Sequence, residues 1–347
     1  MKIRLFFPLL LLCHCSLVLA QPLYKSYLCY RTDKPIMVDG NLDESGWKKV
    51  PWSDPFMDIE GSRKPPPRLL TCMKMLWDKN YLYIGAALQE PNVWATLTQR
   101  DTVIFNDNDF EVFIDPNGDS HDYGEFEMNA FNTGWDLFLP IPYKDGGKAD
   151  DGWNINGLKT GVKIFGTLNN AADQDSGWTV EIAIPWKALS KLRHTVQPPL
   201  HGNQWRVNFS RVEWKTMTIG QSYQKIPKTP EDNWVWSPQG VVDMHRPEEW
   251  GIVQFSTDPI GKSVAKPYPY LEERKILHKI YYAQKSYYEK NKSYADSLEA
   301  LDMRSDGAFP PILRKTSTGF QAMLKVKSNN GRAKLLIIRE DAKIWIQ

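Results

Sequence analysis

Alternation of apolar and polar residues is the feature that most limits what this 347-residue chain can fold into. Phe110, Val112 and Ile114 alternate mainly with carboxylates, and the same two-residue period recurs over 126–130 and 178–184. A period of two is that of a β-strand with one buried face. Loops rich in Pro, Gly and Asp separate these segments. We therefore predict a mainly β fold, an antiparallel jelly-roll-like β-sandwich.

A helical pattern begins after a linker that we expect over 261–270. From Leu271 to Tyr288, charged residues accompany apolar ones at the spacing of an amphipathic helix. The apolar stripe of this helix would consist of Ile276, Ile280, Ala283 and Tyr287. Further on, Asn330-Gly331 is a hairpin signal between strand-like segments. These elements predict a small C-terminal α+β unit, a helix plus a β-meander, over 271–347, separate from the β-sandwich over 21–260.

The N-terminus has the pattern of a secretory signal. Residues 1–20 combine a basic start, an apolar run and a small-residue end, so we expect cleavage before Gln21 and export to the periplasm or the exterior. No later stretch is long and apolar enough to span a bilayer. A net charge of +2 is not typical of a protein that binds polyanions, so nucleic acid is not an expected partner.

Two cysteines remain after the signal, Cys29 and Cys72, and each lies in a strand-like context. In an oxidising compartment a disulfide between them is the favoured interpretation, and two buried free thiols are the alternative. The chain also contains 14 Trp, and secreted proteins so rich in Trp often stack these rings on sugars.

Several segments, taken in order, resemble carbohydrate-binding module family 9 and its secreted relatives. They include "PIMVDGNLDESGW" over 35–47, "NDNDFEVFIDPNGD" over 106–119, "GWTVEIAIPWKAL" over 177–189 and "WSPQGVVDMHRPEEWGIVQF" over 236–255. The resemblance implies a jelly-roll-like β-sandwich related to DOMON domains. It also implies non-catalytic binding of polysaccharide or oligosaccharide ends, in support of polysaccharide breakdown and with a glycoside hydrolase as a partner.

The resemblance also implies a site in which two aromatic rings sandwich a sugar and polar groups bind its hydroxyls. It places the first ring at Phe105, the strand glutamate at Glu111 and further polar groups at Glu127 and Asn129. The second ring would fall near Met244, where this chain has no Trp. Nearby tryptophans would then have to replace it: Trp236 first, with Trp234 and Trp94 as alternatives.

The strand period supports this site independently of the resemblance. If the two acidic strands are neighbours, Asp109, Glu111, Glu127 and Asn129 share the outward face. Sugar hydroxyls suit such a row of acceptors. An ordinary solvated sheet face is the alternative, as is an ion pair of Glu111 with Arg206 or Arg211. For Arg211 itself, pairing with a buried carboxylate is the commoner outcome.

Two other functional classes are weighed against sugar binding. A glycoside-processing enzyme needs two carboxyls at ~5–9 Å, and Glu111 with Glu127, or Glu125 with Glu127, could supply them. A strand face offers the acid no evident apolar pocket, so catalysis is the weaker interpretation. Some DOMON relatives bind haem, but Met244 and His245 would point to opposite faces of a strand and could not ligate one haem together.

An oxygen-rich loop follows the first acidic strand. The segment "DPNGDSHD" places Asp115, Asp119 and Asp122 around Gly118, as calcium loops do, although the spacing of an EF-hand is missing. An Asx-rich turn is the preferred interpretation, and structural calcium, implied by the resemblance, is the alternative. No cofactor is required for the predicted function.

Overall fold

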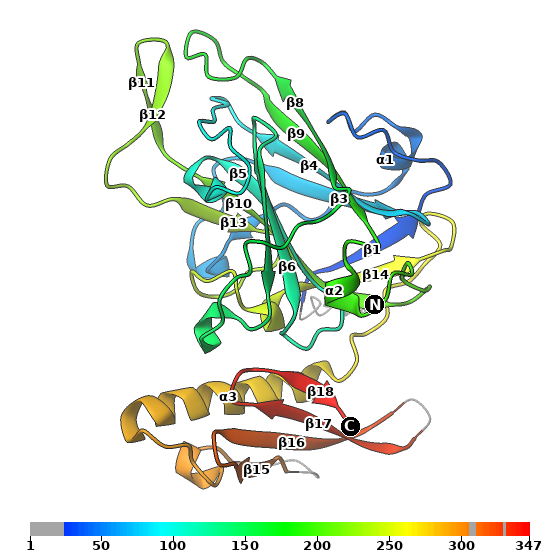
Figure 1. Ribbon diagram of the computed structural model, residues 1–347, viewed down its shortest axis with the longest axis vertical. Coiled ribbons are helices and arrows are strands. Elements are labelled where there is room, and N and C mark those ends of the chain that lie inside the picture. The colour runs from blue at the N-terminus through cyan, green and yellow to red at the C-terminus, as the bar shows by residue number, and fades with distance from the viewer. Residues whose placement is uncertain (1–23, 305–309, 329–330) are drawn as a thin grey trace, which may run out of the picture.

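The computed structural model describes residues 24–304, 310–328 and 331–347. The expected signal at 1–20 lies outside this range. Among the described residues, no helix is long and apolar enough to cross a membrane. Figure 1 shows two bodies, a large β-domain (residues 24–256) and a smaller C-terminal unit (residues 271–347).

One strongly curled sheet forms the β-domain, and the described part of the chain gives it a continuous path of ten strands (Figure 1). In spatial order these strands are β7 (Gly134–Leu139), β6 (Tyr123–Asn129), β5 (Asp109–Asp115), β10 (Gln204–Glu213), β14 (Gly251–Ser256), β1 (Ser26–Arg31), β3 (Thr71–Trp77), β4 (Tyr81–Gln89), β9 (Gly177–Pro185) and β8 (Lys159–Phe165). Off this path, β13 (Asp232–Val235) pairs with β10, and β2 (Met57–Asp58) pairs with β13. A separate hairpin joins β11 (Thr216–Ile219) and β12 (Ser222–Lys225).

The predicted mainly β class is confirmed, but the expectation of a wholly antiparallel sandwich is wrong. Strand β1 runs parallel to both β14 and β3, so the sheet is mixed. The sequence could not show this, because a two-residue period tells which face of a strand is buried and not which strand pairs with it or in which direction.

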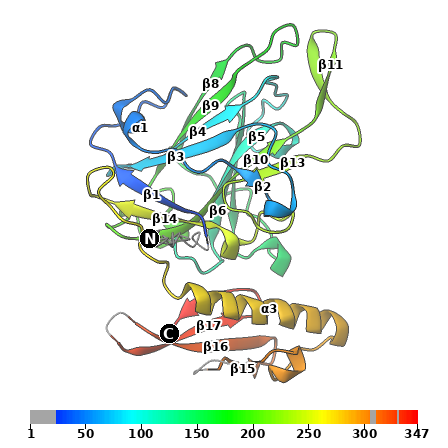
Figure 2. The same ribbon diagram turned by 180° about the vertical axis from the view of Figure 1, so that it is seen from behind.

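The core lies inside the curl of the sheet, where β5, β6 and β10 face β3, β4 and β9 (Figure 2). Phe110 stacks against Phe56 and Phe209, with ring centroids 6.4 and 5.9 Å away. Val112, Ile114 and the apolar residues of β6 belong to the same core. The apolar side of the acidic strands therefore faces the core, as predicted.

Short helices fill the connections of the β-domain. They are α1 (Ser45–Lys49), α2 (Ser190–Arg193) and the 3-10 turns η1 (Gly61–Arg63), η2 (Ile104–Asn106), η3 (Tyr143–Asp145) and η4 (Pro247–Glu249). The turns η2 and η3 lie beside the outer face of β5–β7, and η4 faces the C-terminal unit.

The C-terminal unit consists of one long helix on a four-stranded antiparallel sheet. The helix is α3 (Leu271–Asn291), the sheet has the order β15 (Ile312–Lys315), β16 (Phe320–Lys327), β17 (Ala333–Arg339), β18 (Ile344–Ile346), and η5 (Glu299–Leu301) joins them. The predicted helix, the strands flanking the Asn-Gly signal and the final strand are present, while β15 was not predicted. Part of the hairpin turn itself lies outside the described residues.

The predicted apolar stripe of α3 is rotated from the buried one. Ile276 is 39% exposed, whereas Leu277, Ile280 and Tyr281 are buried against the small sheet. In both views α3 lies between this sheet and the β-domain (Figures 1 and 2). The face toward the β-domain is polar, with Arg274 buried there. Because two sides of the helix are covered, a single apolar stripe does not define its buried surface.

The expected disulfide is not formed, and both Cys29 and Cys72 are free. Tyr30 of β1 is level with Leu76 of β3 in a parallel pair, so Cys29 lies level with Met75. Cys72 is three residues away along β3, on the order of 10 Å at the usual rise per strand residue. A disulfide requires Cα atoms closer than about 7 Å, so the register of these strands rules it out.

Candidate functional site

The acidic strands are direct neighbours, so the condition for the predicted shared face is met. Glu111 of β5 is paired with Glu127 of β6, and Asp109 is paired with Asn129. Glu127 is paired in turn with Trp135 of β7. With the two-residue alternation of side chains, these residues share the outer face of a three-stranded floor.

This outer face is buried, so the alternative of an ordinary solvated sheet face is wrong. Glu111 and Glu127 are buried, and so is Glu125 on the same face. A small apolar cluster explains the burial, because Phe113, Leu137 and Trp250 pack there beneath the segment that contains Met244. The carboxyls therefore form the floor of a pocket. Loops cover this pocket, and their sequences lack the two-residue alternation of a strand.

The pocket has a volume of about 250 Å³. Its floor is made by Glu111, Glu125, Glu127 and Phe113, and its walls and rim by Ile59, Phe105, Trp135, Leu137, Tyr143, Val212, Glu231, Asn233, Val242, Asp243, Met244 and His245. It combines buried carboxyls with aromatic rings, and it brings together three predicted site residues: Phe105, Glu111 and Glu127.

Phe105, the central residue of η2, is positioned by its own backbone. Its N–H donates to Glu127 Oε2 at 3.0 Å, and its carbonyl oxygen accepts from Trp214 Nε1 at 2.8 Å. The side chain remains 39% exposed at the pocket. A ring held by two backbone hydrogen bonds and still accessible is preorganised for stacking.

The floor carboxyls hold protons more tightly than free carboxyls do. Burial raises the pKa of Glu111 to about 7. Burial, and then the charge of Glu111, raises the pKa of both Glu125 and Glu127 well above the usual range. Oxygens of Asp109, Glu111 and Glu127 lie within 4.8 Å of one another, so ionising one disfavours ionisation of the others. Near neutral pH the floor thus offers both O–H donors and oxygen acceptors.

No basic side chain neutralises Glu111 or Glu127 by an ion pair within the described residues. The alternative of a pair with Arg206 or Arg211 is therefore wrong. Arg211 instead contacts Glu90 and Glu213 through Nη2 at 2.7 and 2.8 Å, which confirms its interpretation as the partner of buried carboxylates. The floor carboxyls are left to interact with a ligand.

Asn129 does not line the pocket. Its Nδ2 donates to Leu97 O at 2.8 Å and to Asp107 Oδ2 at 2.9 Å. Its Oδ1 accepts the N–H groups of Phe131 and Thr133, both at 3.1 Å. With both ends of the amide bonded within the protein, Asn129 holds the turn after β6 and has no group free for a sugar.

The tryptophans expected to provide the second ring all lie away from the pocket. Trp236 is 1% exposed, belongs to the core and packs on Phe209 at 5.9 Å. Trp234 is buried under the guanidinium groups of Arg68 and Arg211. Trp94 is buried as well. The prediction of Trp236 as a binding residue is wrong, because a ring that fills the core cannot stack on a ligand.

Two rings that the sequence analysis missed, those of Trp135 and Tyr143, line the pocket instead. Trp135 of β7 lies beside Glu127 in the ladder, and its buried Nε1 has no hydrogen-bond partner among the described residues. Tyr143 of η3 is 44% exposed and meets the His245 ring edge-on at 4.4 Å. The alternation of "GWDLFL" over β7 could have located Trp135. Tyr143 lies in a turn, which has no such signal.

Met244 and His245 lie in a loop and both line the pocket, so the strand argument used against haem does not hold. His245 Nδ1 is 2.9 Å from Tyr123 Oη, and its Nε2 is 4.0 Å from Glu125 Oε2. Burial lowers the pKa of His245 to about 4, so the ring is neutral at neutral pH. Its position beside the carboxyl floor makes it a part of the polar lining.

The loop after β5 forms an Asx-rich turn. Asp115 accepts the N–H of Gly118 at 2.8 Å and of Ser120 at 2.9 Å, one with each carboxylate oxygen. The carbonyl of Asp119 accepts from Ile344 N at 3.1 Å, so this loop also contacts the C-terminal unit. These contacts are those of the preferred turn interpretation, and calcium at Asp115, Asp119 and Asp122 stays a prediction.

The geometry is that of a β-domain with a small pocket lined by aromatic rings and carboxyls. Residues 38–237 match the family "Carbohydrate family 9 binding domain-like". This match covers more than half of the chain, which therefore belongs to that family of carbohydrate-binding domains.

Curated relatives match only through a small part of their own length. Exoglucanase XynX of Acetivibrio thermocellus is 27% identical over 181 residues, which is 52% of this chain and 14% of that protein. Endo-1,4-beta-xylanase A of Thermoanaerobacterium saccharolyticum is 26% identical over 160 residues, 46% of this chain and 12% of that protein. The chain thus spans about a seventh or less of these relatives.

Among solved structures, a family 9 carbohydrate-binding module from Caldicellulosiruptor kristjanssonii in complex with cellotriose aligns with a TM-score of 0.45 and 16% identity, over 70% of this chain and 100% of that chain. A putative carbohydrate-binding protein from Bacteroides uniformis aligns with a TM-score of 0.49 and 16% identity, over 67% of this chain and 99% of that chain.

Proposed function

We propose that the pocket on the outer face of β5–β7 binds the terminal sugar of an oligosaccharide or polysaccharide without transforming it. The observation that carries this proposal is the combination in one pocket of the accessible Phe105 ring with the carboxyls of Glu111 and Glu127, which no basic side chain neutralises within the described residues.

The chemistry of a sugar matches this lining in two ways. Its apolar ring face stacks on an aromatic side chain such as Phe105, with Tyr143 and Trp135 on other walls. Its hydroxyls both donate and accept, as do carboxyls that exchange a proton near neutral pH. A pocket of about 250 Å³ favours one sugar at a chain end over a run of several.

Calorimetric titration of the purified protein with cellotriose, xylotriose and glucose tests this site. Phe105→Ala should weaken binding by roughly 1–3 kcal/mol, about tenfold or more, and Glu111→Gln by a similar amount. Phe165→Ala is the matched control, because Phe165 is also an exposed phenylalanine but lies on β8, outside the pocket. If both pocket variants keep the affinity of the unmodified chain, the sugar binds elsewhere.

A glycoside-processing activity is the second candidate, because the carboxyl oxygens of Glu111 and Glu127 are close and burial raises both pKa values. A retaining mechanism needs one carboxyl ionised as nucleophile and the other protonated as acid. Here the whole floor favours protons and no cation holds one group ionised, which favours binding. Release of reducing sugar from cellotriose or xylotriose that is lost in Glu111→Gln would establish the enzyme instead.

We further propose that the protein is exported and supports polysaccharide breakdown beside glycoside hydrolases. The basic and apolar N-terminus supports export, and membership of the family supports the role. Mass spectrometry of the cellular fractions should find a mature N-terminus at Gln21 in the periplasm or medium. A full-length chain that remains in the cytoplasm would contradict this proposal.

A further inference from the structure

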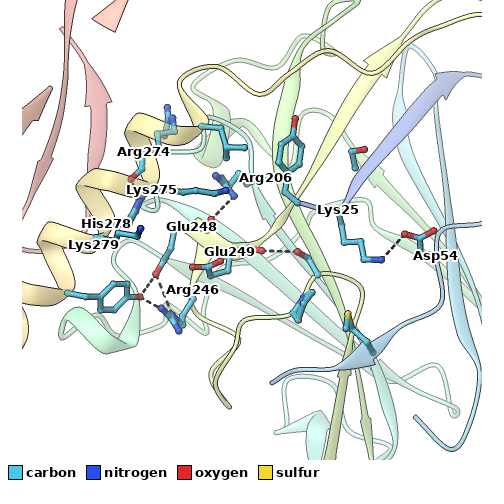
Figure 3. Close-up of a pocket in the computed structure, with 17 residues that line it drawn as sticks. Lys25, Asp54, Arg206, Arg246, Glu248, Glu249, Arg274, Lys275, His278 and Lys279 are labelled. Carbon is cyan, nitrogen blue, oxygen red and sulfur yellow. Dashed lines mark hydrogen bonds and ion pairs between the residues drawn. The ribbon is translucent and has the colours of Figure 1, made fainter. Parts of the chain in front are cut away.

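A second cavity, of about 630 Å³, lies between the β-domain and α3 (Figure 3). The β-domain contributes Arg206 of β10 and the segment around η4, with Arg246, Glu248 and Glu249. The helix contributes the side chains Arg274, Lys275, His278, Lys279 and Tyr282. This cavity shares no lining residue with the pocket on the outer face of β5–β7, called the sugar pocket below.

Positive charge dominates the cavity. Six Lys or Arg side chains line it against three carboxylates, those of Asp54, Glu248 and Glu249. Lys25 is paired with Asp54 at 2.7 Å, and Arg246 with Glu248 at 3.5 Å. None of the remaining cations forms an ion pair with a carboxylate of the lining, and with six cations against three carboxylates the cavity carries a net positive charge.

Arg206 and Arg274 are the two buried cations of the lining, and the carboxylates of Asp115 and Glu249 interact with Arg206 only from beyond ion-pair distance. Within the described chain neither forms an ion pair, and both donate to backbone carbonyls: Arg206 Nη1 to Glu248 O at 2.7 Å and Arg274 Nη1 to Gly118 O at 2.8 Å. Both guanidinium groups lie over the ring of Tyr268, at 4.8 and 5.3 Å from its centroid. A carbonyl satisfies a donor but does not neutralise a buried charge.

The cavity also contains polar atoms that lack partners. Of the ten buried side-chain atoms without a hydrogen-bond partner in the described residues, three belong to this lining: Arg274 Nε, His278 Nε2 and Glu248 Oε2. His278 Nδ1 faces Arg274 O at 2.9 Å and must donate to it, so Nε2 of the neutral ring is an acceptor. Glu248 Oε2 is an acceptor as well. A ligand here must supply donors as well as negative charge.

We propose that the cavity between β10, η4 and α3 binds an acidic sugar, with its carboxylate toward Arg206 and Arg274 and its hydroxyls toward His278 and Glu248. A simple inorganic anion would neutralise the two guanidinium groups but leave both acceptors without donors. A neutral sugar would do the reverse. A uronate carries one carboxylate and several hydroxyls, and so satisfies both sets of groups. The site does not depend on the sugar pocket of β5–β7.

Glucuronate, glucose and sulfate serve as probes in calorimetric titrations of the full chain. In the Phe105→Ala chain, whose sugar pocket is weakened, glucuronate should still bind, whereas glucose and sulfate should bind at least tenfold more weakly. Arg274→Gln should reduce the affinity for glucuronate tenfold or more. Lys279, exposed at the rim with no ion pair in the described chain, should contribute about two- to fivefold, tested with Lys279→Gln. Lys290→Gln, at an exposed position of the same helix outside the cavity, should change nothing.

Two controls separate this site from the sugar pocket. Phe105→Ala should leave glucuronate binding unchanged while it weakens cellotriose, and Arg274→Gln should do the opposite. Sulfate that binds as tightly as glucuronate would overturn the acidic-sugar proposal in favour of a plain anion site. Glucuronate binding that is absent, or that survives Arg274→Gln in a chain with unchanged circular dichroism, would overturn it as well.

Discussion

Glu111 and Glu127 face each other across the β5–β6 ladder with no basic side chain paired to either in the described chain. Such a pair is unfavourable for folding when it is ionised and tolerable when it shares protons. A pair of this kind indicates a role other than stability. The buried carboxyls of the sugar pocket therefore make the folded domain less stable than it would be without them.

The stability of the protein should therefore fall as pH rises through neutrality. The pKa of Glu111 is raised from an ordinary 4.5 to about 7, so its protonated form stabilises the fold fully below pH 4.5, and this stabilisation is lost as pH passes about 7. The effect is on the order of 1–3 kcal/mol. Thermal unfolding between pH 6.5 and 8, above the range in which the buried His245 and His278 oppose the effect, should show a declining midpoint, and Glu111→Gln should flatten the decline. Equal slopes in both proteins would contradict this.

At the scale of elements, β5 separates two functions on its two faces. Phe110 belongs to the core and Glu111 to the pocket, one residue apart. Phe110→Ala should remove the stacking with Phe56 and Phe209 and leave a cavity, at a cost of about 3–5 kcal/mol in the free energy of unfolding. Phe105→Ala should change that free energy by less than about 1 kcal/mol. Urea denaturation of both variants checks this. Similar losses would mean that Phe105 is structural.

The pairing of β1 with β3 leads to a prediction about the thiols. Cys29 is buried and lies level with Met75, out of reach of Cys72. Titration of the unreduced protein with a thiol reagent in denaturant should find both of these cysteines free. Without denaturant, Cys72 should react first, because Cys29 is fully buried and burial raises the pKa of its thiol well above the usual value. A single peptide that links the two after digestion would contradict this.

Elements with a clear period were predictable, whereas the direction and partners of distant strands were not. Alternation located the inner face of β5 and β6, and the resemblance located Phe105, Glu111 and Glu127. The parallel pairing of β1, the burial of Trp236 and the wall provided by Tyr143 depend on contacts between distant segments, which leave no local pattern. The buried polar face of α3 was not predicted either. Arg274 and His278 are buried there, and an apolar pattern does not identify a face made of such residues.

On the scale of the whole molecule, the C-terminal unit contacts two loops that line the pocket proposed to bind sugar. Asp145 of η3 contacts Lys285 of α3 at 2.8 Å and accepts a hydrogen bond from Tyr281. Tyr143, two residues earlier in the same turn, lines the pocket. A second contact joins Tyr282 to Glu248 and Arg246, next to His245 of the lining. The two units are therefore coupled through two loops of the β-domain.

Loss of these contacts should weaken sugar binding without unfolding the β-domain. The β-domain and the C-terminal unit have separate apolar cores, so a chain that ends at Ser263 should keep its β-sheet circular dichroism. We expect about three- to tenfold weaker binding of cellotriose, because η3 loses Lys285 and Tyr281, and complete loss of glucuronate binding. Insoluble protein would show instead that α3 is required for the β-domain to fold.

The same coupling can be tested in the intact chain. Asp145→Asn keeps the shape of the side chain but removes the charge that holds Lys144 and Lys285, so η3 should loosen while both cores stay complete. Affinity for cellotriose should fall about two- to fivefold, and the glucuronate site should change little because Asp145 does not line that cavity. The control is Lys290→Gln, at an exposed position of α3. Equal cellotriose affinities of Asp145→Asn and this control would mean that Tyr143 keeps its position without the C-terminal unit.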